Sequence, residues 1–282
     1  MKRDGYEEST LLGISRKLKH LDIHTNLANP ESVITFIMNK IATNGYKNNL
    51  SIAYLHFARF HNLDFKLNIL KHKSKHIRIP TTEELNSLIN SARNPLSLKL
   101  RVFKETGLRP IELVMLKTND VDIERKTIYP TTAKNGSPRT LKISHALATL
   151  LQTYIIRKDR SLNSLLFNTK IKALRTNYSV SRNRTSKKLG NPRLSKIRLY
   201  DFRHYFATNL YARTKDILYV QKQMGHKNLR NTLIYTQLIN FDEEENFTCK
   251  VAKTQQEMTE LIEHGFTFIH EKDGLAYFRK RK

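Results

Sequence analysis

The first 65 residues carry apolar positions at helical spacing. Residues 15–65 are rich in Leu, Ile, Phe and Tyr. Asn29-Pro30 is typical of a helix start, because a short polar side chain can cap free amides and proline suits the first turn. The apolar stripe that follows consists of Val33, Ile34, Ile37 and Ile41. A second helix is expected around Ala53 and Tyr54, so this region predicts a group of short helices.

A second helical region begins near Pro80. Thr81 and Glu84 have the spacing of a capping box, in which each residue satisfies a free amide of the other. Further helices are expected over residues 96–106, where Gly107 would stop the helix, and over residues 110–117. Helices are also expected to begin near residues 144, 201 and 216. The pattern predicts a mainly α-helical domain.

The helical pattern is interrupted between residues 126 and 144. Residues 127–129 and 140–143 are rich in β-branched and other apolar side chains, and Lys134-Asn135-Gly136-Ser137-Pro138 lies between them. An Asn-Gly step favours the tight turn of a β-hairpin. We therefore expect a small antiparallel sheet within the helical domain.

The last forty residues have their own pattern. Thr254 and Glu257 repeat the capping-box spacing, and Gly265 is placed to end that helix. Residues 266–270 and 275–278 flank Lys272-Asp273-Gly274, which indicates a second hairpin. The prediction is a helix followed by a hairpin.

These patterns divide the chain into four parts. We expect a helical domain over residues 1–70, a basic linker over 71–79, a catalytic domain over 80–240 and an extension over 241–282. The linker residues Lys71, Lys73 and Lys75 are candidates for contact with a phosphate backbone. The alternative is a linker that is only flexible and solvated.

Composition narrows the class of protein. No apolar run approaches the roughly 18 residues that a membrane span requires. The polar start has no apolar signal segment, so we expect a cytoplasmic protein. Cys249 is the only cysteine, which excludes an internal disulfide framework.

Charge adds a partner. Fifty Lys and Arg against twenty-five Asp and Glu give a formal net charge of +25. Such an excess favours binding to a polyanion and predicts strong salt dependence. The alternative is a basic surface with no particular ligand, and charge alone leaves DNA and RNA both open.

Several side chains are candidates for chemistry, although each has an ordinary explanation when taken alone. Arg109 lies at a loop-to-helix junction, where Glu112 is placed to pair with it. Lys134 lies at the hairpin tip, where lysine is common for solubility. Arg203 follows Phe202 on a helix, and His226 follows the probable helix terminator Gly225. Tyr235 is one of twelve tyrosines, most of which pack as half-buried residues in proteins.

Their order along the chain is more specific than any one of them. Leu108-Arg109-Pro110, Asp201-Phe202-Arg203-His204 and Met224-Gly225-His226 are followed by Tyr235, nine residues after the histidine. This order resembles the tyrosine recombinase, or phage integrase, family over residues 81–238, and the expected subtype is Xer-like and archaeal. The resemblance implies a helical core-binding domain and a catalytic domain that close around duplex DNA as a C-shaped clamp.

The resemblance also implies roles for these residues. Guanidinium groups of Arg109 and Arg203, with His226, would bind the oxygens of a DNA phosphodiester. Tyr235 would be the nucleophile and Lys134 the general acid. Supporting roles fall to Glu112 and His204, and Arg139 is a further candidate for DNA binding. No metal or other cofactor is implied, and the partners would be double-stranded DNA and a homotetramer formed on it from monomers or weak dimers, in association with the nucleoid.

One position departs from the family pattern. Tyr200 stands three residues before Arg203, where the family usually has histidine. The tyrosine hydroxyl, with a pKa near 10, is a poor base at neutral pH. His204 is adjacent to Arg203 but is rotated from it by roughly 100° on a helix, so we do not expect it simply to replace that imidazole.

Other functions remain open at this point. The chain could be a silent relative that binds DNA without cutting it. Asp120 and Asp122 raise the possibility of a metal-dependent nuclease, but no third carboxylate joins them and a loop before a strand explains them. An RNA-binding protein would explain the charge but not the ordered motifs. Among recombinases we favour integration or excision of a mobile element over Xer-like resolution of circular replicon dimers.

Overall fold

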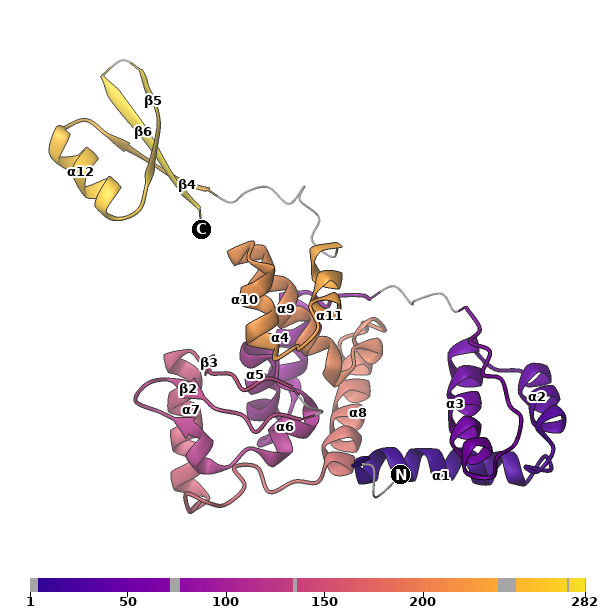
Figure 1. The fold of residues 1–282 in the computed structure, drawn as a ribbon. Helices are drawn as coiled ribbons and strands as arrows, with labels where there is room; N and C mark the ends of the chain where they lie inside the picture. The colour runs from indigo at the N-terminus through magenta and orange to yellow at the C-terminus, as the bar shows by residue number, and fades with distance from the viewer. Residues whose placement is uncertain (1–4, 72–76, 134–135, 238–246, 273, 282) are drawn as a thin grey trace. The chain divides into compact units, whose positions relative to one another are not determined.

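The computed structural model describes residues 5–71, 77–133, 136–237, 247–272 and 274–281. The chain divides into two compact units, residues 1–76 and 77–282. Figure 1 colours them from indigo at the N-terminus to yellow at the C-terminus. Within the described part of the chain, no helix combines the length and the apolar character that crossing a bilayer would require.

The described residues of the first unit form three helices: α1 (Glu8–Asp22), α2 (Pro30–Asn39) and α3 (Asn44–Phe60). Asn29 caps α2 by accepting a hydrogen bond from the Ser32 amide, which confirms the predicted helix start. The core of the unit is formed by Leu21, Val33, Ile37, Leu50, Tyr54 and Ala58. Ile41 was wrongly assigned to this stripe, because α2 ends at Asn39 and leaves Ile41 fully exposed.

The chain that follows α3 stays attached to it. The Asn48 side chain both donates to the Leu70 carbonyl and accepts from the Leu70 amide, each at 2.9 Å. The side-chain Nδ2 of Asn44 donates to the Lys71 carbonyl at 2.7 Å. Lys71 therefore lies against the first unit with an exposed side chain, whereas Lys73 and Lys75 lie outside the described residues.

The second unit begins with helices α4 (Thr82–Ser91), α5 (Leu96–Thr106) and α6 (Pro110–Met115). The capping box predicted for α4 is present. Its later helices are α7 (His145–Arg157), α8 (Ile171–Lys188), α9 (Leu199–Thr214), α10 (Ile217–Met224) and α11 (Arg230–Leu233), with 3₁₀ turns η1 (Thr118–Asp120), η2 (Leu194–Lys196) and η3 (Ile234–Gln237). Helix α5 packs against α4 and α9, and Phe103 meets Phe202 between α5 and α9. Helices α5 and α9 carry or precede the segments that contain Arg109 and Arg203.

A small antiparallel sheet interrupts these helices. Its strands are β1 (Val121–Asp122), β2 (Thr127–Ile128) and β3 (Leu141–Lys142), in that spatial order. Ile128 stands opposite Leu141, so the predicted pairing of these two segments is confirmed. The tip residues Lys134 and Asn135 lie outside the described residues. The mainly α-helical fold with a small antiparallel sheet is thus as expected.

Helix α8 was not predicted. Its buried face consists of Leu174 and Tyr178 followed by the small hydroxyl residues Ser181, Thr185 and Ser186. Because only two of these five residues are strongly apolar, the helical periodicity is weak in the sequence. Tyr178 donates to the Ile197 carbonyl at 3.0 Å, so tertiary contacts hold a helix that its hydrophobic pattern does not reveal.

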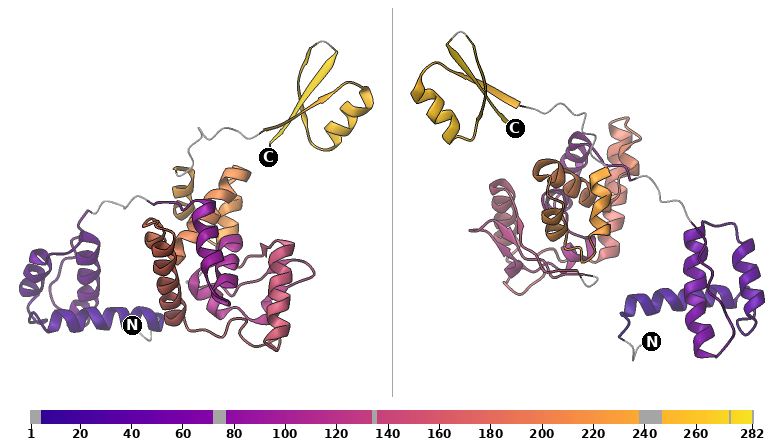
Figure 2. Two further views of the ribbon diagram at one scale, coloured as in Figure 1. Left: turned by 180° about the vertical axis from the view of Figure 1, so that it is seen from behind. Right: turned by 45° about the horizontal axis from the view of Figure 1, so that its top comes forward.

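The last described stretch forms a sheet of its own, with β4 (Phe247–Ala252), β5 (Thr267–Lys272) and β6 (Leu275–Arg281) in the order β4-β6-β5. Helix α12 (Gln255–Glu263) has the predicted Thr254–Glu257 capping box and packs on one face of the sheet (Figure 2). Its core is Ala252, Ala276 and Phe278. The helix and hairpin were predicted; strand β4 was not.

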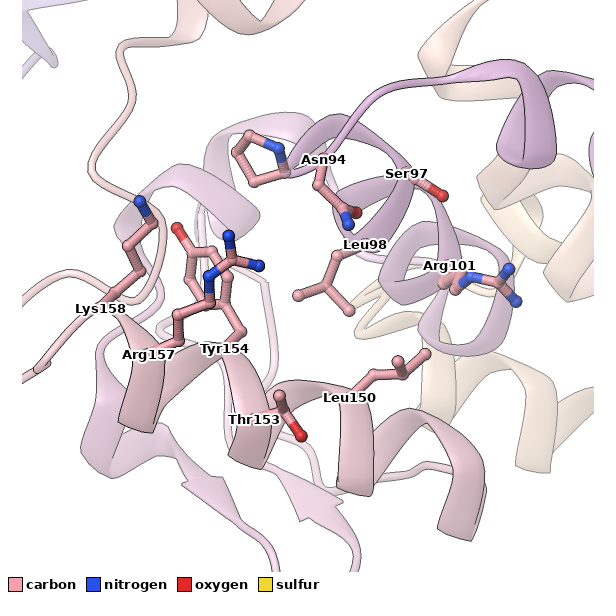
Figure 3. A pocket seen from close by; sticks show the side chains of 10 residues that line it. Asn94, Ser97, Leu98, Arg101, Leu150, Thr153, Tyr154, Arg157 and Lys158 are labelled. Atoms are coloured by element: carbon pink, nitrogen blue, oxygen red, sulfur yellow. The ribbon is translucent and has the colours of Figure 1, made fainter.

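One open cavity lies away from the motif residues. It has a volume of about 360 Å³ and lies between the start of α5 and the end of α7 (Figure 3). Leu98, Leu150 and Tyr154 contribute to its lining, and the Arg157 side chain stands beside Tyr154. None of the candidate site residues lines this cavity. Arg109 follows the opposite, C-terminal end of α5.

Candidate active site

Arg203 is the centre of the site. It lies on α9 with 1% of its surface exposed. Its Nη1 donates to the Gly107 carbonyl at 2.6 Å, and its Nη2 donates to the Met224 carbonyl and contacts His226 Nε2 at 3.1 Å. One guanidinium therefore joins the end of α5, the end of α10 and the turn after α10. Its Nε is buried and has no partner among the described residues.

Arg109 lies just after the segment that Arg203 holds. As expected, it pairs with Glu112: its Nη1 donates to Oε1 at 2.7 Å and its backbone amide donates to Oε2 at 2.8 Å. Glu112 is fully buried, whereas the Arg109 side chain keeps 14% of its surface exposed. The carboxylate thus fixes the guanidinium of a side chain that stays partly accessible.

Arg139 shares the same carboxylate. Its Nη2 donates to Glu112 Oε2 at 2.6 Å, and its side chain has no exposed surface. The assignment of Arg139 to DNA contact does not agree with this burial, because a guanidinium enclosed with its counter-ion has no face for a phosphate. Burial alone would raise the pKa of Glu112, but hydrogen bonds and charge from Arg139 and Arg109 outweigh it and lower that pKa. Arg139 is a support beneath the site.

The site carries excess positive charge. Burial and the neighbouring charges of Arg109 and Arg139 lower the pKa of Arg203 to about 10. A guanidinium normally has a pKa above 12, so the lowered pKa reflects first the burial of Arg203 and then the positive neighbours, which Glu112 compensates only in part. A bound anion would relieve this repulsion.

His226 lies directly after the left-handed residue Gly225 that ends α10. A guanidinium has only donors, so His226 Nε2 accepts from Arg203, and the neutral ring then carries its proton on Nδ1, which donates to Thr232 Oγ1 at 2.9 Å. Burial and the charges of Arg203, Arg109 and Arg139 lower the pKa of His226 to about 4. The ring is neutral at physiological pH. Thr232 was not singled out from the sequence, where a buried threonine six residues after the histidine gives no signal.

The hairpin loop reaches the same place. The Ser137 amide donates to the Gly225 carbonyl at 3.4 Å. A Cβ added at Gly136 would stand 3.1 Å from that carbonyl oxygen and 3.4 Å from Arg109 Nη1. Glycine at this position therefore allows the loop to approach closely. Lys134, two residues before Gly136, lies outside the described residues.

Tyr235 is almost fully buried, with 1% of its surface exposed. It lies on η3 and packs against Ala207, Val220 and Met224 of α9 and α10. Its hydroxyl contacts His204 Nδ1 at 3.2 Å. Burial raises the pKa of Tyr235 although the charge of Arg203 opposes the shift. The phenol is thus neutral, and the positive charges of Arg203 and Arg109 act on it.

Tyr200 is placed differently from the other motif residues. It keeps 41% of its surface exposed on the first turn of α9. Its ring meets the His204 ring edge-on at 5.1 Å between centroids. The structure therefore brings Arg109, Arg203, His226 and Tyr235 together around one place and leaves Tyr200 at its edge.

Comparison with known proteins identifies the family. The model of the phage integrase family matches residues 78–240, more than half of the chain. The tyrosine recombinase XerA of Thermococcus kodakarensis is 30% identical over 247 residues, which cover 83% of each chain. XerA of Saccharolobus solfataricus is 30% identical over 189 residues, covering 67% of this chain and 62% of that protein.

Solved structures share the fold. The Tn1549 transposon integrase, in complex with transposon right end DNA, matches with a TM-score of 0.63 at 18% identity over 93% of this chain and 96% of that chain. The XerH site-specific recombinase bound to its difH substrate matches with a TM-score of 0.53 at 25% identity, covering 71% of this chain and 64% of that one. The chain belongs to the phage integrase family of tyrosine recombinases.

Proposed function

We propose that this protein is a site-specific DNA recombinase that cuts one strand with Tyr235 and rejoins it to another end. The phenol would displace the 5′-oxygen and hold the 3′-phosphate as a phosphotyrosine. That bond conserves the energy of the phosphodiester until a second 5′-hydroxyl attacks it, so neither ATP nor a metal ion is required. The observation that carries the proposal is the buried Arg203 guanidinium, which ties the Arg109 segment to His226 and whose charge acts on Tyr235.

The phosphate would bind where positive charge is uncompensated. Negative charge develops on the nonbridging oxygens as phosphorus becomes five-coordinate, and donors fixed in advance stabilise that charge most effectively. Arg203 would offer its Nε, which has no partner among the described residues, and Arg109 would offer a partly exposed side chain whose guanidinium is held by Glu112. Both groups are held in place by protein contacts, so little reorganisation accompanies DNA binding.

His226 and Lys134 would complete the chemistry. His226 accepts from Arg203 in the free protein, and an incoming phosphate would favour a protonated ring that donates to it. We assign the general acid for the 5′-oxygen to Lys134, since the loop that follows it is bonded to the turn before His226.

The helical unit and the linker would also bind the DNA. We propose that the helical unit, with Lys71, Lys73 and Lys75, binds the duplex opposite the catalytic unit, so that the protein forms a C-shaped clamp. Exchange of strands between two sites would require four protomers on DNA, assembled from monomers or weak dimers. Acting on genomic DNA would place the protein with the nucleoid.

A nicked substrate tests the central claim. When the 5′ fragment beside the cut site diffuses away, the covalent intermediate accumulates as an SDS-resistant adduct. We expect this adduct with the wild type in the presence of EDTA and its loss in Tyr235→Phe. An adduct that persists in Tyr235→Phe would assign the nucleophile elsewhere, and DNA binding without any adduct would leave a silent DNA-binding relative.

The biological role has two candidates. We favour integration or excision of a mobile element, because the C-terminal extension adds a module beyond the family match at residues 78–240. The Xer names of the curated relatives favour resolution of circular replicon dimers instead. Mapping adduct sites on the host genome separates them: one chromosomal site per replicon indicates resolution, and an element boundary indicates integration.

A further inference from the structure

We propose that His204 is the residue that positions the hydroxyl of Tyr235 and takes its proton when the phenol attacks DNA. The inference rests on the proposed recombinase function and adds a residue to its chemistry. It assigns to position 204 the imidazole that position 200 lacks.

The geometry of α9 separates two tasks between neighbours. Successive helix residues point roughly 100° apart, so Arg203 and His204 face different surroundings. Arg203 is directed to Gly107 and Met224, whereas His204 Nδ1 reaches the Tyr235 hydroxyl at 3.2 Å. The rotation that argued against His204 as a simple replacement for the histidine missing at position 200 is the rotation that brings its ring to the Tyr235 hydroxyl.

Tyr235 has no other polar partner in the described part of the chain. Among the described residues its hydroxyl forms one hydrogen bond, to His204, and the surrounding side chains of α9 and α10 are apolar. His204 itself is 7% exposed. A proton leaving the phenol in this enclosed place therefore has one acceptor within hydrogen-bond distance.

The charges around His204 suit a neutral acceptor. Burial lowers the pKa of His204, Asp201 opposes this shift, and Arg198 and Arg203 add to it. The neutral ring can carry its proton on Nε2 and accept at Nδ1. After proton transfer the imidazolium would face the carboxylate of Asp201, which Arg198 holds at 2.7 Å.

In strand cleavage, one proton leaves the phenol and another reaches the leaving oxygen. The Tyr235 O–H proton moves to His204 Nδ1 while the phenol oxygen forms a bond to phosphorus. The bond from phosphorus to the 5′-oxygen breaks, and that oxygen receives a proton from the general acid that we assign to Lys134. In the reverse attack a 5′-hydroxyl gives its proton to Lys134 as its oxygen bonds to phosphorus, the bond from phosphorus to the Tyr235 oxygen breaks, and His204 returns a proton to that oxygen.

Tyr200 is not placed to do this. Its side chain is 41% exposed and contacts the His204 ring edge-on, with no hydrogen bond to Tyr235. Its position suits a neighbour that orients the imidazole. We therefore separate the two residues experimentally.

The test measures single-turnover cleavage of a nicked site by His204→Gln and by the matched control His145→Gln, an exposed histidine at the start of α7. We expect His204→Gln to bind the DNA with unchanged affinity and to cleave about 100-fold more slowly, as loss of a general base predicts. The slow variant should stay slow on a substrate with a bridging 5′-sulfur, which restores variants that lack the general acid. His145→Gln should match the wild type.

Two further measurements guard against a purely structural effect. Imidazole in the buffer should accelerate cleavage by His204→Ala, whereas a variant that is merely misfolded gains nothing. Wild-type cleavage should be constant near neutral pH and fall below pH 6.5, because protonation removes the acceptor. Wild-type rates in His204→Gln, rescue by the 5′-sulfur substrate or absence of imidazole rescue would overturn the proposal. If the wild type itself forms no adduct, the proposed function fails and His204 is not in question.

Discussion

The two halves of the site are built in opposite ways. On the arginine side, Arg109 and Arg139 are paired with Glu112, and Arg203 is bonded to backbone carbonyls. The Arg203 Nε has no partner among the described residues, and part of the Arg109 side chain is exposed. On the tyrosine side, the hydroxyl of Tyr235 is buried, neutral and bonded to one histidine. Under the proposed function, the half that would bind phosphate is already assembled without DNA, whereas the proposed nucleophile is enclosed.

The largest effect is expected on the tyrosine side. Tyr235→Phe removes the attacking oxygen, so cleavage should fall below detection in the nicked-substrate assay. The phenyl ring still fills the space between α9 and α10, so DNA affinity and the melting temperature should change little. A large loss of stability would mean that the hydroxyl is structural.

Arg203→Ala should come next. Loss of its transition-state contacts should slow cleavage by about 10³-fold. Unlike Tyr235→Phe, it also releases Gly107 and Met224, so the melting temperature should fall. Thermal denaturation of both variants, measured side by side, checks the contrast; equal stability would contradict the structural role of the arginine side.

Glu112→Gln tests the support beneath the arginines. Removing the carboxylate leaves Arg139 buried without a counter-ion, and breaking such a pair costs about 3–5 kcal/mol. We expect a marked loss of stability in denaturant unfolding and slower cleavage, but less slowing than in Arg203→Ala. Arg125→Gln is the matched control, because it breaks an exposed pair with Asp122.

Acid should weaken the arginine side through His226. Its pKa in the folded protein, about 4, lies below the ordinary value of 6.5, so the unfolded chain binds the proton first. Stability from this group is complete above pH 6.5 and is lost as the pH falls toward 4. The free energy of unfolding should fall less over this window in His226→Gln than in the wild type; parallel curves would contradict the assignment.

The smallest effect is expected at Tyr200. Tyr200→Phe keeps the ring beside His204 and removes only the hydroxyl of a residue that is 41% exposed, so cleavage should stay within about two-fold of the wild type. Tyr200→Ala should cost more, since His204 loses its ring contact, but much less than Arg203→Ala. Single-turnover rates give the order, and equal abolition by Tyr200→Ala and Arg203→Ala would show that Tyr200 acts directly.

Features that depend on neighbouring residues could be predicted from the sequence alone. Capping signals at Asn29, Thr81 and Thr254 and the hairpin pairing of Ile128 with Leu141 are local, because they depend on residues close together in the chain. The ordered motifs around Arg109, Arg203, His226 and Tyr235 indicated the family, because that chemistry requires these residue types.

The contacts among those residues depend on the packing of distant segments and could not be predicted from the sequence. Helix α8 is held by distant partners rather than by its own pattern, and the burial of Arg139 depends on a carboxylate 27 positions away. The same is true of His204, whose partner Tyr235 lies 31 residues further on. Helix geometry fixes the direction of a side chain from its neighbours in sequence, but what it meets depends on how distant segments pack.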